Sequence, residues 1–434
     1  MRVSATLINV DSTINTELRY SLRMPMRAAW ISAREAAQRL DVKLATLYAY
    51  ASRGLVESVP AAQGERGRRY AAASIERLKT RHDARAGHAA VAADALRWGE
   101  PSIETSIVEI RADGPAYRGE GVLSLCARAE SFESVADLLW QGQLGPARWS
   151  ARPLTLAVPP SRSTRPDLAS PIAHLAAAVA VAALEDEGRH GATVPDEHAR
   201  ARRLVLWLAS LAGGRRARAP AAAGVAERVL VGYGVRASEK KVRMIDRALI
   251  LCADHELNAS TFAARVAAST GADLYACLGA ALHTLSGPKH GGVSARVEAL
   301  LREITRPSKA LSVVHARRAR GEHVPGFGHP LYPQGDPRAR ALIELAATAR
   351  RSPRIEALCA AMARGGQPPA NFDVGLVALC QAVGLPDGGA AALFAVGRSA
   401  GWIAHALEQR AQGYILRPRA RYTPDARELG GRGR

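Results

Sequence analysis

The chain has 434 residues, 48% of them hydrophobic, and carries a net charge of +19 that comes mostly from arginine. This composition excludes a wholly disordered chain and leaves room for two or three domains, while the charge indicates either an anionic partner or a general excess of solvated arginine. No uncharged apolar run reaches eighteen residues, so no membrane-spanning helix is predicted. No secretory signal opens the sequence, and the five cysteines form no CxxC pair. These two features predict a reduced, cytoplasmic protein.

Residues 1–26 show no regular pattern and are predicted to be a disordered leader. Residues 27–82 are predicted to form a helix-turn-helix domain. Its first helix, "SAREAAQRL", begins with Ser32 and Glu35 at capping-box spacing, and its second, "KLATLYAYASRGL", ends at Gly54. The following "VESVPAAQGERGRRY" is predicted to form a hairpin with a glycine-rich tip.

This region resembles the winged helix-turn-helix of excisionases and mercury regulators. The resemblance implies that the second helix enters the DNA major groove and that the hairpin contacts phosphates. Residues 27–80 hold ten basic and five acidic side chains, which fits a DNA-binding face. The alternative is a helix-turn-helix retained for protein contacts. The implied DNA contacts are Lys43, Thr46 and Tyr48 on the helix, and Arg66, Arg68 and Arg69 on the hairpin.

Residues 83–99 are predicted to be a linker, residues 100–425 a long helical system, and residues 426–434 a tail. Helical periodicity is clear in "SFESVADLLWQGQLG", in "STGADLYACLGAALHTLSG" and in a long segment that ends at Gly413. Strand signals are sparse, and only residues 106–119 are predicted to form a small hairpin. The fold class is therefore predicted to be all-α.

Four motifs carry residue types suited to chemistry: "ADHELNAS" with His255, "LSGPKHGG" with His290, "VPGFGHPLYPQGDPR" with His329 and "NFDVGLV" with Asp373. Glycines and prolines around His290 and His329 favour turns that project the side chain into a cleft. A carboxylate can remove a proton beside a carbonyl, histidines can hydrogen-bond the oxygens that gain charge, and arginines can bind carboxylates. No HExxH spacing occurs, so no metal site is predicted.

Taken together, the order and approximate spacing of these motifs over residues 100–425 resemble the citrate synthase superfamily. The resemblance implies an all-α fold with a large domain and a small domain, the small one spanning about residues 293–395. It implies a homodimer, no permanently bound cofactor, and condensation of acetyl-CoA or another short acyl-CoA with oxaloacetate to give citrate or 2-methylcitrate.

The same resemblance implies a role for each site residue. Asp373 would remove the methyl proton of acetyl-CoA, His290 would stabilise the enol, and His329 would polarise the keto oxygen of oxaloacetate. The residues implied to bind substrate carboxylates are His255, Arg338 and Arg398, with Arg417 acting from the other subunit.

The sequence departs from the family where CoA phosphates are commonly held. Pro330 and Pro333 stand where basic residues are expected, and Lys289 is unusual before His290. The predicted substitutes are four nearby cations: Lys309, Arg317, Arg318 and Arg320. The alternative function is a DNA-binding transcriptional regulator that senses oxaloacetate, citrate or acyl-CoA through a retained site.

Overall fold

The computed structural model describes residues 30–40, 42–52, 56–60, 67–72, 74–75, 78, 103–154, 156, 170–191, 193–214 and 219–418. The predicted leader (1–26), linker (83–99) and tail (426–434) lie outside these residues, as does Arg66. Thr105–Leu416 forms one compact unit, and the described residues before Thr105 fall in another, together with Arg417 and Pro418. None of the described helices is long and apolar enough to cross a membrane.

Within the described ranges of residues 30–78, the first unit combines two short helices with a three-stranded antiparallel sheet. Its elements are β1 (Trp30–Ser32), α1 (Ala33–Arg39), α2 (Leu44–Ser52), β2 (Ser58–Pro60) and β3 (Arg68–Ala71), with strand order β1-β3-β2. The Ser32 side chain accepts a hydrogen bond from the Glu35 backbone N–H at 3.2 Å, which confirms the predicted N-cap. Leu47 of α2 and Tyr70 of β3 are fully buried and belong to a separate hydrophobic core.

The second unit opens with the predicted hairpin and is otherwise helical. Strands β4 (Val108–Arg111), β5 (Gly114–Tyr117) and β6 (Glu120–Gly121) form an antiparallel sheet in that order, which confirms the hairpin. The helices are α5 (Val122–Ala127), α6 (Phe132–Gln141), α7 (Pro171–Glu185), α8 (Val194–Leu211), α9 (Val225–Gly232), α10 (Glu239–Cys252), α11 (Ala259–Ser269), α12 (Leu274–Leu285), α13 (Val293–Glu303), α14 (Ala310–Ala319), α15 (Pro337–Ala349), α16 (Pro353–Arg364), α17 (Phe372–Val383) and α18 (Gly389–Gln412), with short 3-10 turns η1 (Glu187–Arg189) and η2 (Pro307–Lys309).

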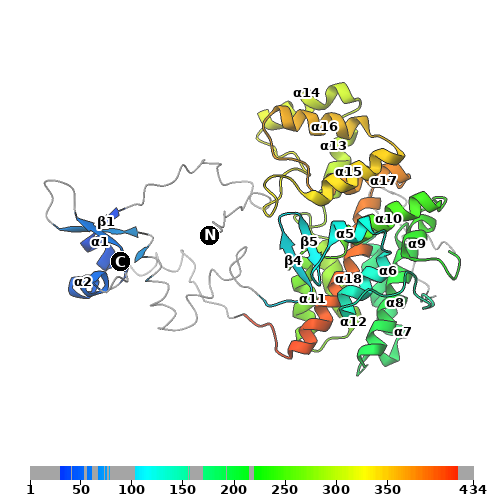
Figure 1. Cartoon of the computed structure of the whole chain (residues 1–434), viewed down its shortest axis with the longest axis horizontal. Helices are drawn as coiled ribbons and strands as arrows, with labels where there is room; N and C mark the ends of the chain where they lie inside the picture. The colour runs from blue at the N-terminus through cyan, green and yellow to red at the C-terminus, as the bar shows by residue number, and fades with distance from the viewer. Residues whose placement is uncertain are drawn as a thin grey trace, which may run out of the picture. The chain divides into compact units, whose positions relative to one another are not determined.

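Helix α18 runs through the middle of this unit and packs against α6, α10, α11 and α12 (Figure 1). A Cβ at Gly397 would lie 2.6 Å from the Cys252 Cβ, so only glycine allows α10 to approach this closely. One turn later, the Gly401 N–H donates to the Ala253 carbonyl at 3.0 Å. The loop that follows α10, which carries His255, is therefore held against α18.

Helices α13, α14, α15 and α16 lie together in the upper part of Figure 1. In this group α14 packs against α16, and α15 packs against α17, which in turn contacts α10 and α18. The loop between α14 and α15 carries His329, and α17 carries Asp373. The packing of α17 on α10 and α18 therefore brings the motifs of the upper group to those of the lower helices.

Candidate active site

Two of the predicted histidines meet around a tyrosine. His255 lies between α10 and α11, and His329 lies before α15; their ring centroids are 5.2 Å apart and nearly perpendicular. The Tyr332 hydroxyl lies 3.1 Å from His255 Nε2, and its ring centroid is 5.1 Å from that of His329. The segment of glycines and prolines around His329 thus folds back so that Tyr332 joins the two histidines.

His290 is held by a polar cluster at the start of α11. It lies in the turn between α12 and α13, and its Nε2 is 2.8 Å from Ser260 Oγ. Trp402 Nε1–H of α18 donates to the same oxygen at 3.2 Å, and Ser260 Oγ donates to Asn258 Oδ1 at 2.7 Å. The start of α11, supported by α18, therefore orients the His290 ring.

All three imidazoles are neutral near pH 7. Burial and, to a smaller extent, the charge of Arg398 lower the pKa of His290 to about 4. Burial and the charge of Arg338 likewise lower the pKa of His329 to about 4. Burial is the main cause that lowers the pKa of His255 well below its ordinary value, and the charges of Arg338 and His329 lower it further. The Leu331 backbone N–H donates to His329 Nδ1 at 3.2 Å, so the proton of the neutral ring lies on Nε2. His329 can therefore donate a hydrogen bond to a carbonyl oxygen without being charged.

Asp373 is the second residue of α17 and its carboxylate is tied to α13. The Asn371 side chain caps α17 by accepting from the Asp373 N–H at 3.1 Å, and the Ser294 hydroxyl donates to Asp373 Oδ1 at 2.6 Å. Burial raises the pKa of Asp373, while Ser294 and Arg338 oppose that rise. A carboxylate with a raised pKa suits proton abstraction near neutral pH.

The His329 loop and the segment before α17 are joined backbone to backbone. The Asn371 N–H donates to the Gly326 carbonyl at 2.8 Å, the Gly328 N–H donates to the Pro369 carbonyl at 2.9 Å, and Phe327 forms an isolated bridge with Ala370. Gly326 has a φ of +87°, and a Cβ there would lie 2.5 Å from Val374 Cγ2. These contacts fix the His329 loop relative to Asp373.

Two buried arginines supply positive charge to the same region. Arg338 donates from Nε and Nη2 to Asp336 at 3.0 and 2.7 Å, and its guanidinium carbon lies 4.7 Å from the Phe372 ring centroid. Arg398 donates from Nε to the Cys252 carbonyl at 2.5 Å, but its buried Nη1 has no hydrogen-bond partner among the described residues. A buried guanidinium with an unpaired N–H is suited to an anionic ligand, because the desolvated charge gains most from a carboxylate.

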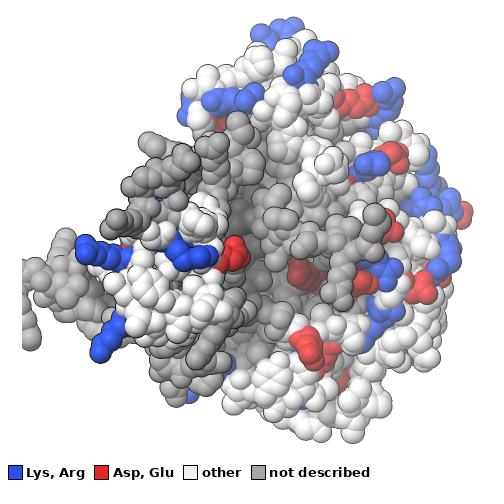
Figure 2. All heavy atoms as spheres, turned by 60° about the vertical axis from the view of Figure 1, so that its left-hand side comes forward, with Lys and Arg blue, Asp and Glu red and all other residues white. Residues whose placement is uncertain are grey.

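The remaining predicted residues are not joined to this cluster. Arg417 is exposed and belongs to the other compact unit, so its role stays a prediction. Among the four predicted CoA contacts, Arg317 pairs with Glu303 and Glu322, and Arg320 donates to Glu322 at 2.5 Å. Lys309 and Arg318 are exposed. Lys and Arg side chains gather at the top of Figure 2, the level at which Figure 1 shows α14 and α16.

The polar partners of the site were not predicted from the sequence. Tyr332 had a weak signal, because it stands between two prolines in the His329 segment, and Ser260 lies five residues after His255. Ser294 had none, since a serine in the first turn of a helix is ordinary. Their contacts join segments up to 142 residues apart, which no local pattern reveals.

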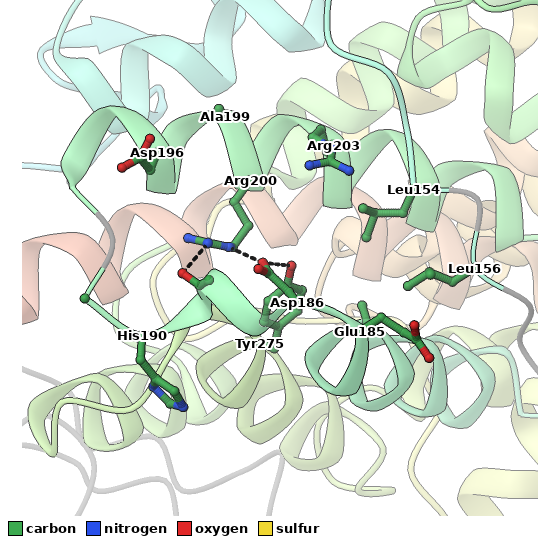
Figure 3. A pocket seen from close by; sticks show the side chains of 13 residues that line it. Leu154, Leu156, Glu185, Asp186, His190, Asp196, Ala199, Arg200, Arg203 and Tyr275 are labelled. Carbon is green, nitrogen blue, oxygen red and sulfur yellow. Dashed lines mark hydrogen bonds and ion pairs between the residues drawn. The ribbon is translucent and has the colours of Figure 1, made fainter.

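A cavity of about 610 Å³ between α7, α8 and α12 is separate from these residues (Figure 3). The Arg200 Nε donates to the Asp186 carboxylate at 2.6 Å, and the Tyr275 hydroxyl donates to it at 2.7 Å. These donors satisfy the Asp186 carboxylate, whereas Arg200 Nη1 has no hydrogen-bond partner among the described residues. None of the predicted site residues lines this cavity. We therefore take the histidine cluster, not this cavity, as the candidate active site.

Comparison with known proteins agrees with the motif-based resemblance. The family model for the citrate synthase C-terminal domain matches residues 95–419. "Putative citrate synthase 2" of Mycobacterium tuberculosis is 35% identical over 343 residues, which cover 75% of this chain and 91% of the relative. The "2-methylcitrate synthase" of the same species is 31% identical over 335 residues, covering 70% and 84%.

Solved structures match the same part of the chain. Citrate synthase from Pyrobaculum aerophilum has a TM-score of 0.64 and 28% identity, covering 77% of this chain and 92% of that one. A Thermoplasma acidophilum citrate synthase, solved as a ternary complex with carboxymethyl coenzyme A and oxaloacetate, has a TM-score of 0.65 at 24% identity, covering 76% of this chain and 97% of that one. At that identity the second likeness supports the fold alone.

Proposed function

This chain belongs to the citrate synthase family, and on that premise we propose that it condenses a short acyl-CoA with oxaloacetate to give citrate or 2-methylcitrate and CoA. The observation that carries the proposal is the cluster itself: neutral histidines, a carboxylate with a raised pKa and two buried guanidinium groups. This set can remove a proton from a weak carbon acid and bind a dicarboxylate, with no permanently bound cofactor.

Carbon–carbon bond formation begins with proton transfer to Asp373. The C–H bond beside the thioester breaks, its electron pair moves toward the thioester carbonyl, and the proton goes to the carboxylate. His290 donates a hydrogen bond to the oxygen that gains charge. This requires a proton on His290 Nδ1. The Ser260 hydroxyl donates to Asn258 Oδ1 in this structure, so it would have to turn and donate to His290 Nε2 across their 2.8 Å contact.

His329 acts on the second substrate. Its Nε2–H, assigned from the Leu331 contact, donates to the keto oxygen of oxaloacetate and makes that carbon more electrophilic. His255, Arg338 and Arg398 bind the carboxylates, with the unpaired Nη1 of Arg398 as the clearest donor. The enol carbon then attacks the keto carbon, and water hydrolyses the resulting thioester to release CoA.

The test is thiol release from a panel of acyl-CoA esters with oxaloacetate. The wild type is expected to turn over acetyl-CoA or propionyl-CoA, and Asp373→Asn to lose at least about a hundredfold in kcat. Asp387→Asn, which removes an exposed carboxylate paired with Arg302, is the matched control and should retain activity. Absence of Asp373-dependent turnover with every ester would reject the proposal.

For the CoA phosphates we propose the cations near α14, with Lys309 and Arg318 as the main contacts. Both are exposed, whereas Arg317 and Arg320 already pair with glutamates and would have to exchange partners. The double variant Lys309→Ala/Arg318→Ala is expected to raise the KM for acyl-CoA about tenfold and to leave the KM for oxaloacetate unchanged. An unchanged KM for acyl-CoA would eliminate these residues as contacts.

We also propose that each site is completed in a homodimer, with Arg417 binding a substrate carboxylate of the partner subunit. A small domain of about residues 293–395 would close over the substrates. Family membership supports both proposals, and the exposed position of Arg417, directly after the helical unit ends at Leu416, supports the first.

A second candidate function, DNA binding by the first unit, is favoured by its two helices and antiparallel sheet around a separate core. Lys43 is exposed beside the start of α2, Tyr48 is 52% exposed on that helix, and Arg68 and Arg69 are exposed on β3. Thr46 is half-buried. With such a unit, the chain would regulate transcription in response to oxaloacetate, citrate or acyl-CoA.

This candidate is tested by selecting DNA sequences with the full chain and measuring their affinity at several salt concentrations. Lys43→Ala is expected to weaken binding and to reduce the salt dependence, while Arg148→Ala, which removes a cation from the other unit, should change neither. Equal binding by wild type and Lys43→Ala, or no selected sequence, would count against it.

A further inference from the structure

Ser294 is placed where it can control the proposed general base. It is the second residue of α13 and only 3% exposed, and its hydroxyl donates to Asp373 Oδ1 at 2.6 Å. An ionised carboxylate can only accept hydrogen bonds, so the serine O–H must be the donor. A short bond of this type is charge-assisted and stronger than one between neutral groups.

The contact is not needed to cap either helix. Helix α13 begins after Gly292, which makes no side-chain cap, and α17 is capped by Asn371. The Ser294 hydroxyl instead reaches a carboxylate on another helix, 79 residues later in the chain. The bond therefore orients the Asp373 side chain more directly than it stabilises local backbone structure.

The two carboxylate oxygens of Asp373 differ as a result. Oδ1 accepts from Ser294, whereas Oδ2 has no hydrogen-bond partner among the described residues. When a proton is transferred to Oδ2, Oδ1 becomes the carbonyl oxygen of the neutral acid and can still accept from Ser294. The serine contact therefore persists through the proton transfer.

We propose that Ser294 is a positioning residue that fixes the Asp373 carboxylate through Oδ1 and leaves Oδ2 to take the substrate proton. The inference rests on the proposed function and adds to it the atom that reacts and the residue that orients it. Breaking the substrate C–H bond forms Oδ2–H, and the electron pair passes to the thioester oxygen facing His290.

Other charged groups also act on Asp373. Burial raises its pKa most, Ser294 lowers it, Arg338 and Arg296 lower it further, and Asp336 raises it. Since Ser294 is the largest of the opposing contacts, its removal should raise the pKa of the base. More of the enzyme would then hold the protonated, inactive form at a given pH.

The experiment compares kcat/KM for acyl-CoA against pH in the full-length wild type, Ser294→Ala and Ser294→Thr. Ser294→Ala is expected to move the acidic limb upward by about one pH unit and to lower kcat about tenfold at pH 7. The KM for oxaloacetate should stay within about twofold, because binding of that substrate does not use the carboxylate. Ser294→Thr restores the hydroxyl and is expected to recover most of the activity.

Ser134→Ala removes a buried hydroxyl from α6 and is the matched control, with no expected shift of the limb. A wild type without turnover would overturn the proposed function. An active wild type whose acidic limb is the same in Ser294→Ala would overturn this inference alone. If Ser294→Ala fails to fold, Ser294→Thr decides the question, because it keeps the hydroxyl. A shifted acidic limb together with a low kcat in Ser294→Thr would contradict the inference about Ser294.

Discussion

At the scale of single residues, the site consists of ionisable groups whose pKa values are shifted by burial. The histidines at 290 and 329 are neutral because burial and nearby arginines lower their pKa values, and Asp373 is more basic because burial raises its pKa. Glycines and prolines singled out His290 and His329 in the sequence, whereas Asp373 was singled out only with its motif. Ser260, Ser294 and Tyr332 were not, because their partners come from distant segments.

The first residue-scale prediction concerns pH. Because Asp373 must be ionised and the histidines neutral, kcat/KM should rise with pH along an acidic limb and then level off, with no descending limb near pH 6.5. A mechanism that needed a charged imidazole would instead lose activity as the pH rises through about 6.5. Steady-state rates across this range distinguish the two, and a descending limb there would contradict the neutral histidines.

The second prediction separates stability from function at Arg398. Its Nη1 is buried without a partner, so Arg398→Met should keep or raise the thermal midpoint of the substrate-free protein. The same change should raise the KM for oxaloacetate about a hundredfold, since charge-assisted bonds to a carboxylate are lost. Thermal melts and kinetics check both effects.

Arg302→Met, in an exposed ion pair, serves as the control and should change neither quantity. A large loss of stability in Arg398→Met with an unchanged KM would assign Arg398 a structural role.

At the scale of elements, the positions of several helices were predictable and the pairing of loops was not. The period of apolar residues and the Ser32 cap predicted helices, and the turn glycines predicted their ends. The pairing of residues 326–328 with 369–371 had no sequence signal, since it depends on backbone groups rather than on side chains. This pairing is nevertheless what sets His329 relative to Asp373.

The element-scale prediction tests that pairing through Gly326→Ala. The substitution combines a φ of +87° with contacts of 2.5 and 2.6 Å to Val374 and Val297, so we expect a destabilisation of about 2–4 kcal/mol and a loss of kcat. Gly366→Ala has a similar φ of +59° but no atom within 4 Å of the new Cβ, and should cost less. Denaturant melts of the two variants measure the difference, and equal losses would contradict the close packing.

At the scale of the whole molecule, two compact units account for the organisation of the chain. The family model begins at residue 95, close to the predicted start of the helical system at residue 100. Ten basic residues against five acidic ones in residues 27–80 are consistent with a separate role for the first unit. Sequence motifs identified the helical system, whereas the proposed homodimer depends on surfaces that motifs do not describe.

The whole-molecule prediction concerns Arg417. If each site combines Asp373 of one subunit with Arg417 of the other, co-expressed Asp373→Asn and Arg417→Ala chains should recover activity in mixed dimers. With random pairing, half of the dimers are mixed and one of their two sites is complete, which gives about a quarter of wild-type activity. Differently tagged chains allow the mixed dimers to be purified, and no recovery in them would place Arg417 outside the partner's site.

Condensation with Asp373 as the base is tested most directly by identifying the product formed from oxaloacetate and acetyl-CoA labelled with ¹³C in the methyl group. We expect the wild type to place the label in a methylene of a tricarboxylic acid, and Asp373→Asn to form at least about a hundredfold less of this acid. Label recovered as free acetate, or a tricarboxylic acid formed equally by Asp373→Asn, would contradict this mechanism.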